Sequence, residues 1–130
     1  MPYARDLLRG SLELMVLTDL SPGHRYGYQI LTSLRDRSAG RVDLKAGTLY
    51  PILHKLEREG CVRSWWDESA GRDRKWYELT AKGRARLECD ACEWLDYAGC
   101  VRAMLAHALH ALDIKLQRTD LRGEPCGGTS

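Results

Sequence analysis

The hydrophobic period of this 130-residue sequence changes twice, at Gly60 and again at Thr80. Before Gly60, apolar residues recur at the three-and-four spacing of amphipathic helices. Between the two positions, short aromatic segments alternate between apolar and polar residues, as strands do. After Thr80 the helical spacing returns and lasts for about three heptads. The sequence therefore predicts a mainly α chain with one small β-hairpin.

Three helices are expected before the hairpin, over residues 5–20, 26–37 and 45–59. Turn sequences separate them, "SPGH" after the first and "SAGR" after the second. The first helix is apolar almost all round, so it must be covered on more than one side. In the second, Gly27 would permit the close approach of another helix. Leu49, Ile52, Leu53 and Leu56 form the buried stripe of the third.

The start of the third helix contains two residues that helix interiors normally exclude, Gly47 and Pro51. Two starts are compatible with them. If Thr48 is the N-cap, Pro51 falls in the first turn, where its missing N–H would be unpaired in any case. If the helix begins near Lys45, Pro51 removes an internal hydrogen bond and should kink the helix. Gly47 suits either a tight entry or the close approach of another molecule.

The expected hairpin is built from "CVRSWWDES", which starts at Cys61, and "DRKWYELT", which starts at Asp73. Turn chemistry joins them in "SAGR", residues 69–72. Three helices followed by a hairpin is the order of a winged helix-turn-helix domain, here over residues 5–80. In that arrangement the third helix enters the DNA major groove.

The candidate DNA-binding residues are those whose hydroxyl, planar or cationic groups can reach base edges and phosphates. The outer face of the third helix offers five of them, and the hairpin tip adds a local surplus of positive charge. They are Lys45, Thr48, Tyr50, His54, Lys55, Arg72, Arg74 and Lys75. A solvated helix face and a solubilising turn are the alternatives.

Thr80 is a plausible N-cap for a long final helix, expected over residues 81–116. At about 1.5 Å per residue this helix would span roughly 40 Å. A helix of that length cannot bury itself against one small domain, so a partner chain is expected. Residues 117–130 are polar and glycine-rich and predict a disordered tail. The apolar face of this long helix that would contact the partner chain, here called the seam, comprises Leu87, Ala91, Trp94, Ala98, Val101, Leu105, Ala108 and Leu112.

Composition limits the classes of protein to consider. A net charge of +2 and a pI near 8.3 do not by themselves indicate a nucleic-acid partner, because binding needs a local basic patch. No apolar run could span a bilayer, and the N-terminus lacks a secretory signal. Five cysteines form no even disulfide framework, which favours reduced thiols and a cytoplasmic protein. When bound to DNA, such a protein would be associated with the nucleoid.

No catalytic or cofactor motif is present, so we expect neither an enzyme nor a cofactor. Cys89 and Cys92 form a C-x-x-C, but a zinc site needs further ligands, and His107 and His110 lie several turns away. Cysteines on a helix are more often packing residues, and no metal site is predicted. A thiol- or metal-responsive switch through Cys89 and Cys92 is retained as an alternative.

Three segments, "YGYQI", "GTLYPILHKLEREGCVRS" and "GRDRKWYELTAKGRARL", together with the long helix, resemble the PadR family of bacterial transcriptional regulators. The resemblance covers roughly Leu7 to Leu112. It implies a homodimeric winged-helix repressor of a palindromic DNA operator. The C-terminal helix, packed with the first helix, would form the dimer interface and bring Leu8 and Leu12 into it.

Members of the smaller PadR subgroup bind flat aromatic or drug-like effectors between the dimer helices, where a tryptophan stacks on them. The resemblance implies that role for Trp94, whereas a packed dimer core is the alternative. Trp76 stands where the family usually has tyrosine, and Trp65 beside Trp66 is unusual. A winged helix that docks another protein is the rival to DNA binding.

Overall fold

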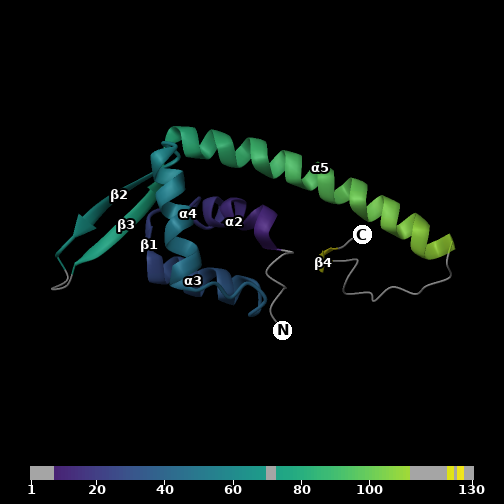
Figure 1. Ribbon diagram of the computed structural model, residues 1–130, viewed down its shortest axis with the longest axis horizontal. Helices are drawn as coiled ribbons and strands as arrows, with labels where there is room; N and C mark the ends of the chain where they lie inside the picture. The colour runs from purple at the N-terminus through teal and green to yellow at the C-terminus, as the bar shows by residue number, and fades with distance from the viewer. Residues whose placement is uncertain (1–7, 70–72, 112–122, 125, 128–130) are drawn as a thin grey trace. The chain divides into compact units, whose positions relative to one another are not determined.

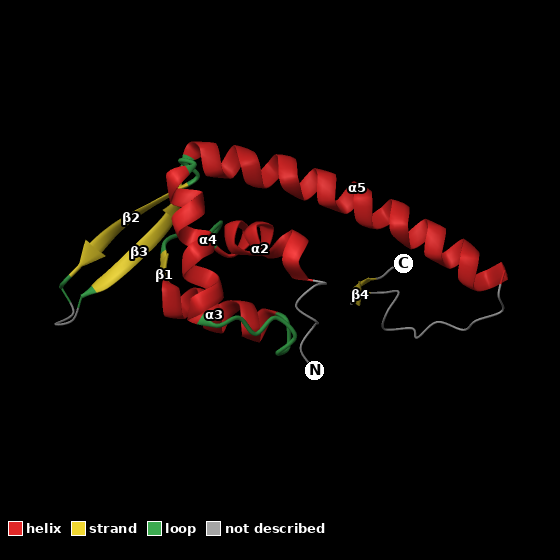
Figure 2. Cartoon of the chain, in the orientation of Figure 1, coloured by secondary structure: helices red, strands yellow, loops and turns green. Residues whose placement is uncertain are grey.

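A computed structural model of the chain describes residues 8–69, 73–111, 123–124 and 126–127 (Figures 1 and 2). The chain is mostly helical, with a small antiparallel sheet and a long C-terminal helix, as predicted. No helix among the described residues is long and apolar enough to cross a membrane. In chain order the elements are η1 (Arg9–Ser11), α2 (Leu12–Asp19), β1 (Arg25–Tyr26), α3 (Gly27–Arg37), α4 (Ala46–Arg58), β2 (Val62–Asp67), β3 (Arg74–Leu79), α5 (Ala81–Ala111), β4 (Gly123–Glu124) and β5 (Cys126–Gly127).

The sheet has the strand order β1-β3-β2, and all its pairs are antiparallel. Strands β2 and β3 are the predicted hairpin, with Ser64 opposite Tyr77 and Trp65 opposite Trp76. This hairpin is called the wing below. Strand β1 was not predicted, because two residues are too short to show an alternating pattern. It joins the wing to the start of α3, which begins at the next residue.

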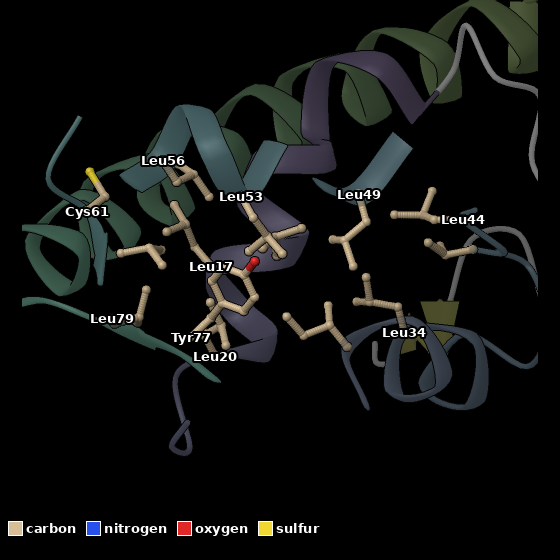
Figure 3. Packing of buried hydrophobic residues seen from close by; sticks show 14 of the residues in the cluster. Leu17, Leu20, Leu34, Leu44, Leu49, Leu53, Leu56, Cys61, Tyr77 and Leu79 are labelled. Carbon is tan, nitrogen blue, oxygen red and sulfur yellow. The ribbon is translucent and has the colours of Figure 1, made fainter. Parts of the chain in front are cut away.

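The core lies between α2, α3, α4 and the inner face of the hairpin (Figure 3). Leu49, Leu53 and Leu56 of α4 are fully buried, so the predicted stripe of leucines packs this helix against the core. Leu17 from α2 and Tyr77 from β3 complete the centre of the cluster, which Figure 3 shows between the ribbons. Burial of one leucine contributes about 2 kcal/mol, so this stripe fixes which face of α4 points outward.

The start of α4 decides between the two alternatives left open by the sequence. The helix begins at Ala46 with Lys45 as its N-cap, and the backbone N–H groups of Thr48 and Leu49 both donate to the Lys45 carbonyl, at 2.9 and 3.0 Å. Thr48 is therefore not the cap. Pro51 lies inside the helix and cannot donate the hydrogen bond that the residue four positions earlier would accept.

The end of α4 follows the prediction. Gly60 has a φ of 79°, the left-handed region that favours glycine. The N–H of Cys61 donates to the Leu56 carbonyl at 2.9 Å, and that of Gly60 donates to the Glu57 carbonyl at 3.0 Å. These two bonds form a Schellman motif, which stops the helix and turns the chain into β2.

Thr80 is the N-cap of α5, as predicted. Its Oγ1 accepts a hydrogen bond from the Gly83 N–H at 3.0 Å and donates one to the Gly60 carbonyl at 2.6 Å. A Cβ on Gly83 would lie 2.0 Å from the Cys61 carbonyl oxygen, so only glycine permits this approach. The start of α5 is thereby fixed to the end of α4.

The chain forms two compact units, Met1–Ala91 and Cys92–Ser130, so the division falls inside α5. The first contains the helices α2 to α4, the three-stranded sheet and the start of α5. The second contains the rest of α5, described to Ala111, so residues 112–116 of the predicted helix lie outside the described residues. Within the predicted disordered tail, β4 and β5 pair with each other.

Candidate nucleic-acid interface

The outer face of α4 is set by its buried stripe. Because Leu49, Leu53 and Leu56 point into the core, His54 is left exposed, whereas Tyr50 is half-buried. The hydroxyl of Tyr50 reaches the start of α3, where a Cβ on Gly27 would lie 2.0 Å from it. Gly27 thus permits the close approach that the sequence predicted, and α3 and α4 are held together beneath the wing.

A hollow of about 720 Å³ lies between the start of α3, the outer face of α4 and the inner face of the wing. Its walls combine aromatic rings with cationic groups. Helices α3 and α4 supply one wall, and β2, β3 and the residue before β3 supply the other. The lining residues are Tyr26, Gly27, Tyr28, Tyr50, His54, Trp66, Asp73, Arg74, Lys75 and Tyr77.

Two cationic residues of β3 line the hollow. The Lys75 ammonium lies 5.8 Å from the centre of the Trp66 ring and 5.9 Å from that of Tyr77. The Arg74 guanidinium lies 4.7 Å from the centre of the Tyr26 ring. Rings within about 6 Å favour a cation through their quadrupole. Arg74 and Lys75 are successive residues of β3, so their side chains lie on opposite faces of the strand. Lys75 faces the hollow beside Trp66 and Tyr77, whereas Arg74 borders it from the side of Tyr26, and Asp73 is the carboxylate among the described lining residues.

The floor of the hollow stays uncharged. Burial, with smaller contributions from Tyr50 and Glu57, raises the pKa of Tyr77 to about 12. Tyr77 is therefore a neutral phenol at physiological pH. The wing is braced to α4 from the same side, because Ser64 Oγ donates to Glu57 Oε2 at 2.7 Å.

The opposite face of the wing is closed by aromatic packing. The ring of His24 lies edge-on to Trp76 at 4.8 Å and to Trp65 at 5.7 Å between centroids. The Trp76 indole donates to Asp67 Oδ2 at 2.9 Å. Hydrogen bonds from Ser69 and from this indole lower the pKa of Asp67 to about 2. Asp67 is therefore ionised at neutral pH and joins β2 to β3 near the outer end of the hairpin.

Lys55, although exposed on α4, has an ion partner inside the protein. Its Nζ donates to Glu13 Oε2 of α2 at 2.6 Å. The same carboxylate accepts from Arg86 of α5 at 2.6 Å, and Arg86 also donates to Glu59 at 2.6 Å and to Asp90 at 3.1 Å. We call Glu13, Lys55, Glu59, Arg86 and Asp90 the ionic cluster. It joins α2, α4 and α5.

The hollow brings together four of the eight candidate DNA-binding residues: Tyr50, His54, Arg74 and Lys75. Two others lie at the first turn of α4 and do not line it, since Lys45 is the exposed N-cap and Thr48 is half-buried.

Lys55 belongs to the ionic cluster, and Arg72 lies outside the described residues. Tyr26, Tyr28 and Trp66 also line the hollow, although the sequence did not single them out as candidates. Tyr26 and Tyr28 are both part of the quoted "YGYQI" segment, which was the available signal.

The predicted dimer residues differ in how far their own chain buries them. Leu8, Leu12 and Leu87 belong to or pack against the core of their own chain. In the outer part of α5, Trp94 and Leu105 are exposed by 44% and 54%, and Ala108 is exposed too. Ala91, Ala98 and Val101 are half-buried, and Leu112 lies outside the described residues.

The cysteines of the described residues do not come together with histidines or carboxylates as a metal site. Cys89, Cys92 and Cys100 are free and exposed, and Cys61 is buried. No group of three or more potential ligands could hold a metal ion among the described residues.

Comparison with known proteins agrees with this architecture. The family model described as the transcriptional regulator PadR-like family matches residues 14–89. The Mycobacterium tuberculosis transcriptional regulator Rv3488 is 35% identical over 86 residues, which are 66% of this chain and 78% of that protein.

Two further matches have similar sequence identities. "Uncharacterized protein X" of Lysinibacillus sphaericus is 32% identical over 92 residues, covering 70% of this chain and 84% of that protein. The crystal structure of a PadR family transcriptional regulator from Eggerthella lenta superposes with a TM-score of 0.69 at 33% identity, covering 77% of this chain and 86% of that one.

Proposed function

Since the chain belongs to the PadR-like family of transcriptional regulators, and so to a family of winged-helix DNA-binding regulators, we propose that α4 and the wing together form its DNA-reading surface. Helix α4 enters the major groove, and the inner face of the wing binds the flanking backbone. The protein acts as a repressor at a palindromic operator.

One observation carries this proposal. The hollow is bordered on one side by His54 of α4, whose planar ring can reach base edges, and on the other by Arg74 and Lys75 of the wing, which can neutralise phosphates. A duplex bound at this hollow could be contacted in its groove by His54 and on its backbone by Arg74 and Lys75 at the same time.

We further propose that the protein is a homodimer formed through α5. Five large apolar side chains of this helix are exposed in the single chain, far more than a solvated helix requires. Two copies of α4 must lie about one helical turn of DNA apart to read both half-sites. The exposed residues are Trp94, Leu95, Tyr97, Met104 and Leu105.

A flat aromatic or drug-like effector would bind beside Trp94 at this dimer interface. Two copies of a large ring are difficult to pack against each other in a seam otherwise rich in alanine and valine, which leaves space for a planar ligand. The effector would favour dimers in which the two α4 helices are wrongly spaced for the operator, and so shift the population away from DNA binding.

Operator binding is tested by an electrophoretic mobility shift with the DNA upstream of the protein's own gene, at two salt concentrations. We expect a complex that random DNA of equal length does not compete away. Its affinity should fall steeply with salt, roughly 10³-fold between 50 and 200 mM if about six phosphates are neutralised. Binding that is insensitive to salt, or no stronger than to random DNA, would contradict the proposal.

The effector site is tested by Trp94→Ala. We expect the variant to remain a dimer in analytical ultracentrifugation, because the rest of the seam is unchanged, and to lose affinity for planar ligands by at least about tenfold. Tryptophan fluorescence of the wild type, titrated with a panel of planar aromatic compounds and drugs, gives the reference. A wild type that responds to none of them, or a variant that binds them equally well, would rule out this site.

A further inference from the structure

Two adjacent tryptophans of β2 have opposite environments. Successive strand residues point to opposite faces of a sheet. Trp65 packs on the outer face of the wing against His24 and is opposite Trp76 in the register. Trp66 lines the hollow on the inner face and is 62% exposed, against 37% for Trp65. The packing of the wing therefore accounts for Trp65 but leaves most of the Trp66 ring unexplained.

The surroundings of Trp66 define what it could contact. The ammonium of Lys75 lies 5.8 Å from its ring centre, and Arg74 lines the same hollow. Across the hollow stands Tyr28, the second residue of α3, which is 65% exposed. Exposed rings beside cations match a ligand that carries apolar and anionic groups close together. A DNA strand does so, because each deoxyribose lies between two phosphates.

We propose that Trp66 is a DNA-contacting residue whose ring packs against the deoxyribose of the strand bound by Arg74 and Lys75. This inference rests on the proposed function and adds a contact of a different physical kind. Phosphate contacts release counterions and weaken as salt rises, whereas apolar contact does not depend on ionic charge. The wing then contributes two parts of the DNA affinity. Salt weakens the part from the phosphate contacts and leaves the part from the apolar contact unchanged.

The test measures binding to duplex DNA selected by the wild-type protein from a random-sequence pool, at 100 and 300 mM salt. We expect Trp66→Ala to weaken binding about tenfold at both salt concentrations, as for loss of a well-packed aromatic contact. The slope of log K against log salt should stay unchanged. Lys75→Ala should instead lower that slope by about 0.9, the value of one phosphate contact. Trp66→Phe should recover most of the affinity.

The matched control is Trp65→Ala, the same change one residue away on the other face of β2. It should lower the melting temperature, because it removes packing against His24, while the protein that remains folded binds DNA nearly as well as the wild type. Trp66→Thr keeps a residue that favours strands and separates loss of contact from loss of the wing. Its affinity should match that of Trp66→Ala.

Three results would overturn the inference, and they are distinguishable. If Trp66→Ala and Trp66→Thr bind as tightly as the wild type while Lys75→Ala is weakened, Trp66 makes no contact and the proposed function stands. If the wild type selects no sequence and binds no duplex above background, the proposed function fails and this contact fails with it. A salt slope that falls in Trp66→Ala as it does in Lys75→Ala would also count against an apolar contact.

Discussion

Tyr50 joins the core and the proposed DNA-reading surface within one side chain. Its hydroxyl occupies the space that a Cβ on Gly27 would need, and its ring borders the hollow beside His54. The sequence predicts contact with DNA for Tyr50, and its position against Gly27 adds a packing role beneath the wing. The structure places Tyr50 where both are possible at once, so its contact with DNA stays a prediction.

Lys55 and Trp66 show which residue properties the sequence could not supply. Helical spacing placed Lys55 on the outer face, and it is exposed there. Its ion pair with Glu13 joins residues 42 positions apart, and no local pattern reveals such a partner. The face of Trp66 depends on the register of the hairpin, which becomes known only when Trp66 is seen opposite Lys75.

At the scale of elements, the ionic cluster connects the proposed dimer helix α5 to the reading helix α4. Glu13 of α2 is the shared member, since it accepts hydrogen bonds from both Lys55 and Arg86. Burial alone would raise the pKa of Glu13, but these two cations outweigh it and lower the pKa below 4.5. The hydrogen bond and negative charge of Glu13 raise the pKa of Lys55.

Replacing Glu13 with glutamine tests the cluster. The change removes the charge shared by two partly exposed ion pairs, each worth about 0.2–1 kcal/mol, so we expect the free energy of unfolding to fall by about 0.4–2 kcal/mol in urea titrations at pH 7. Because the folded-state pKa of Glu13 is lowered, its stabilisation is present above the ordinary value of 4.5 and is lost as pH falls below it. The loss caused by the substitution should therefore shrink as pH falls below that value.

The control for this prediction is Glu88→Gln on α5. Glu88 is exposed, and the described part of the chain shows no ion pair for it. Its substitution should change stability by less than about 0.5 kcal/mol at any pH. Equal effects of the two substitutions, or an effect of Glu13→Gln that persists unchanged below pH 4, would mean that Glu13 stabilises the fold by something other than its charge.

Most elements could be predicted from the sequence, because their signals are local. The leucine stripe placed α4, Gly60 marked its end, and Thr80 marked the start of α5. The start of α4 could not be chosen, because the sequence is compatible both with a cap at Thr48 and with a start near Lys45 that leaves Pro51 inside the helix. Strand β1 pairs with β3 across about fifty residues, and two residues carry no period of their own.

For the whole molecule, the order of elements predicted the winged helix, and the family comparison confirms it. The candidate site was predicted in part. Local charge and periodicity identified His54, Arg74 and Lys75. They could not show that α3 would supply the opposite wall through Tyr28, since that depends on how the first helices pack. The dimer and its effector stay predictions, since they involve a second chain and a ligand.

In the proposed function, α4 reads the base sequence and the wing binds the DNA backbone. The most direct measurement is selection of binding sites from random DNA by the wild type, His54→Ala and Arg74→Ala, with affinities at two salt concentrations. We expect His54→Ala to relax base preference at one position in each half-site. Arg74→Ala should weaken all sequences alike and reduce the salt slope by about one. An unchanged preference in His54→Ala, together with an altered preference in Arg74→Ala, would contradict the proposed function.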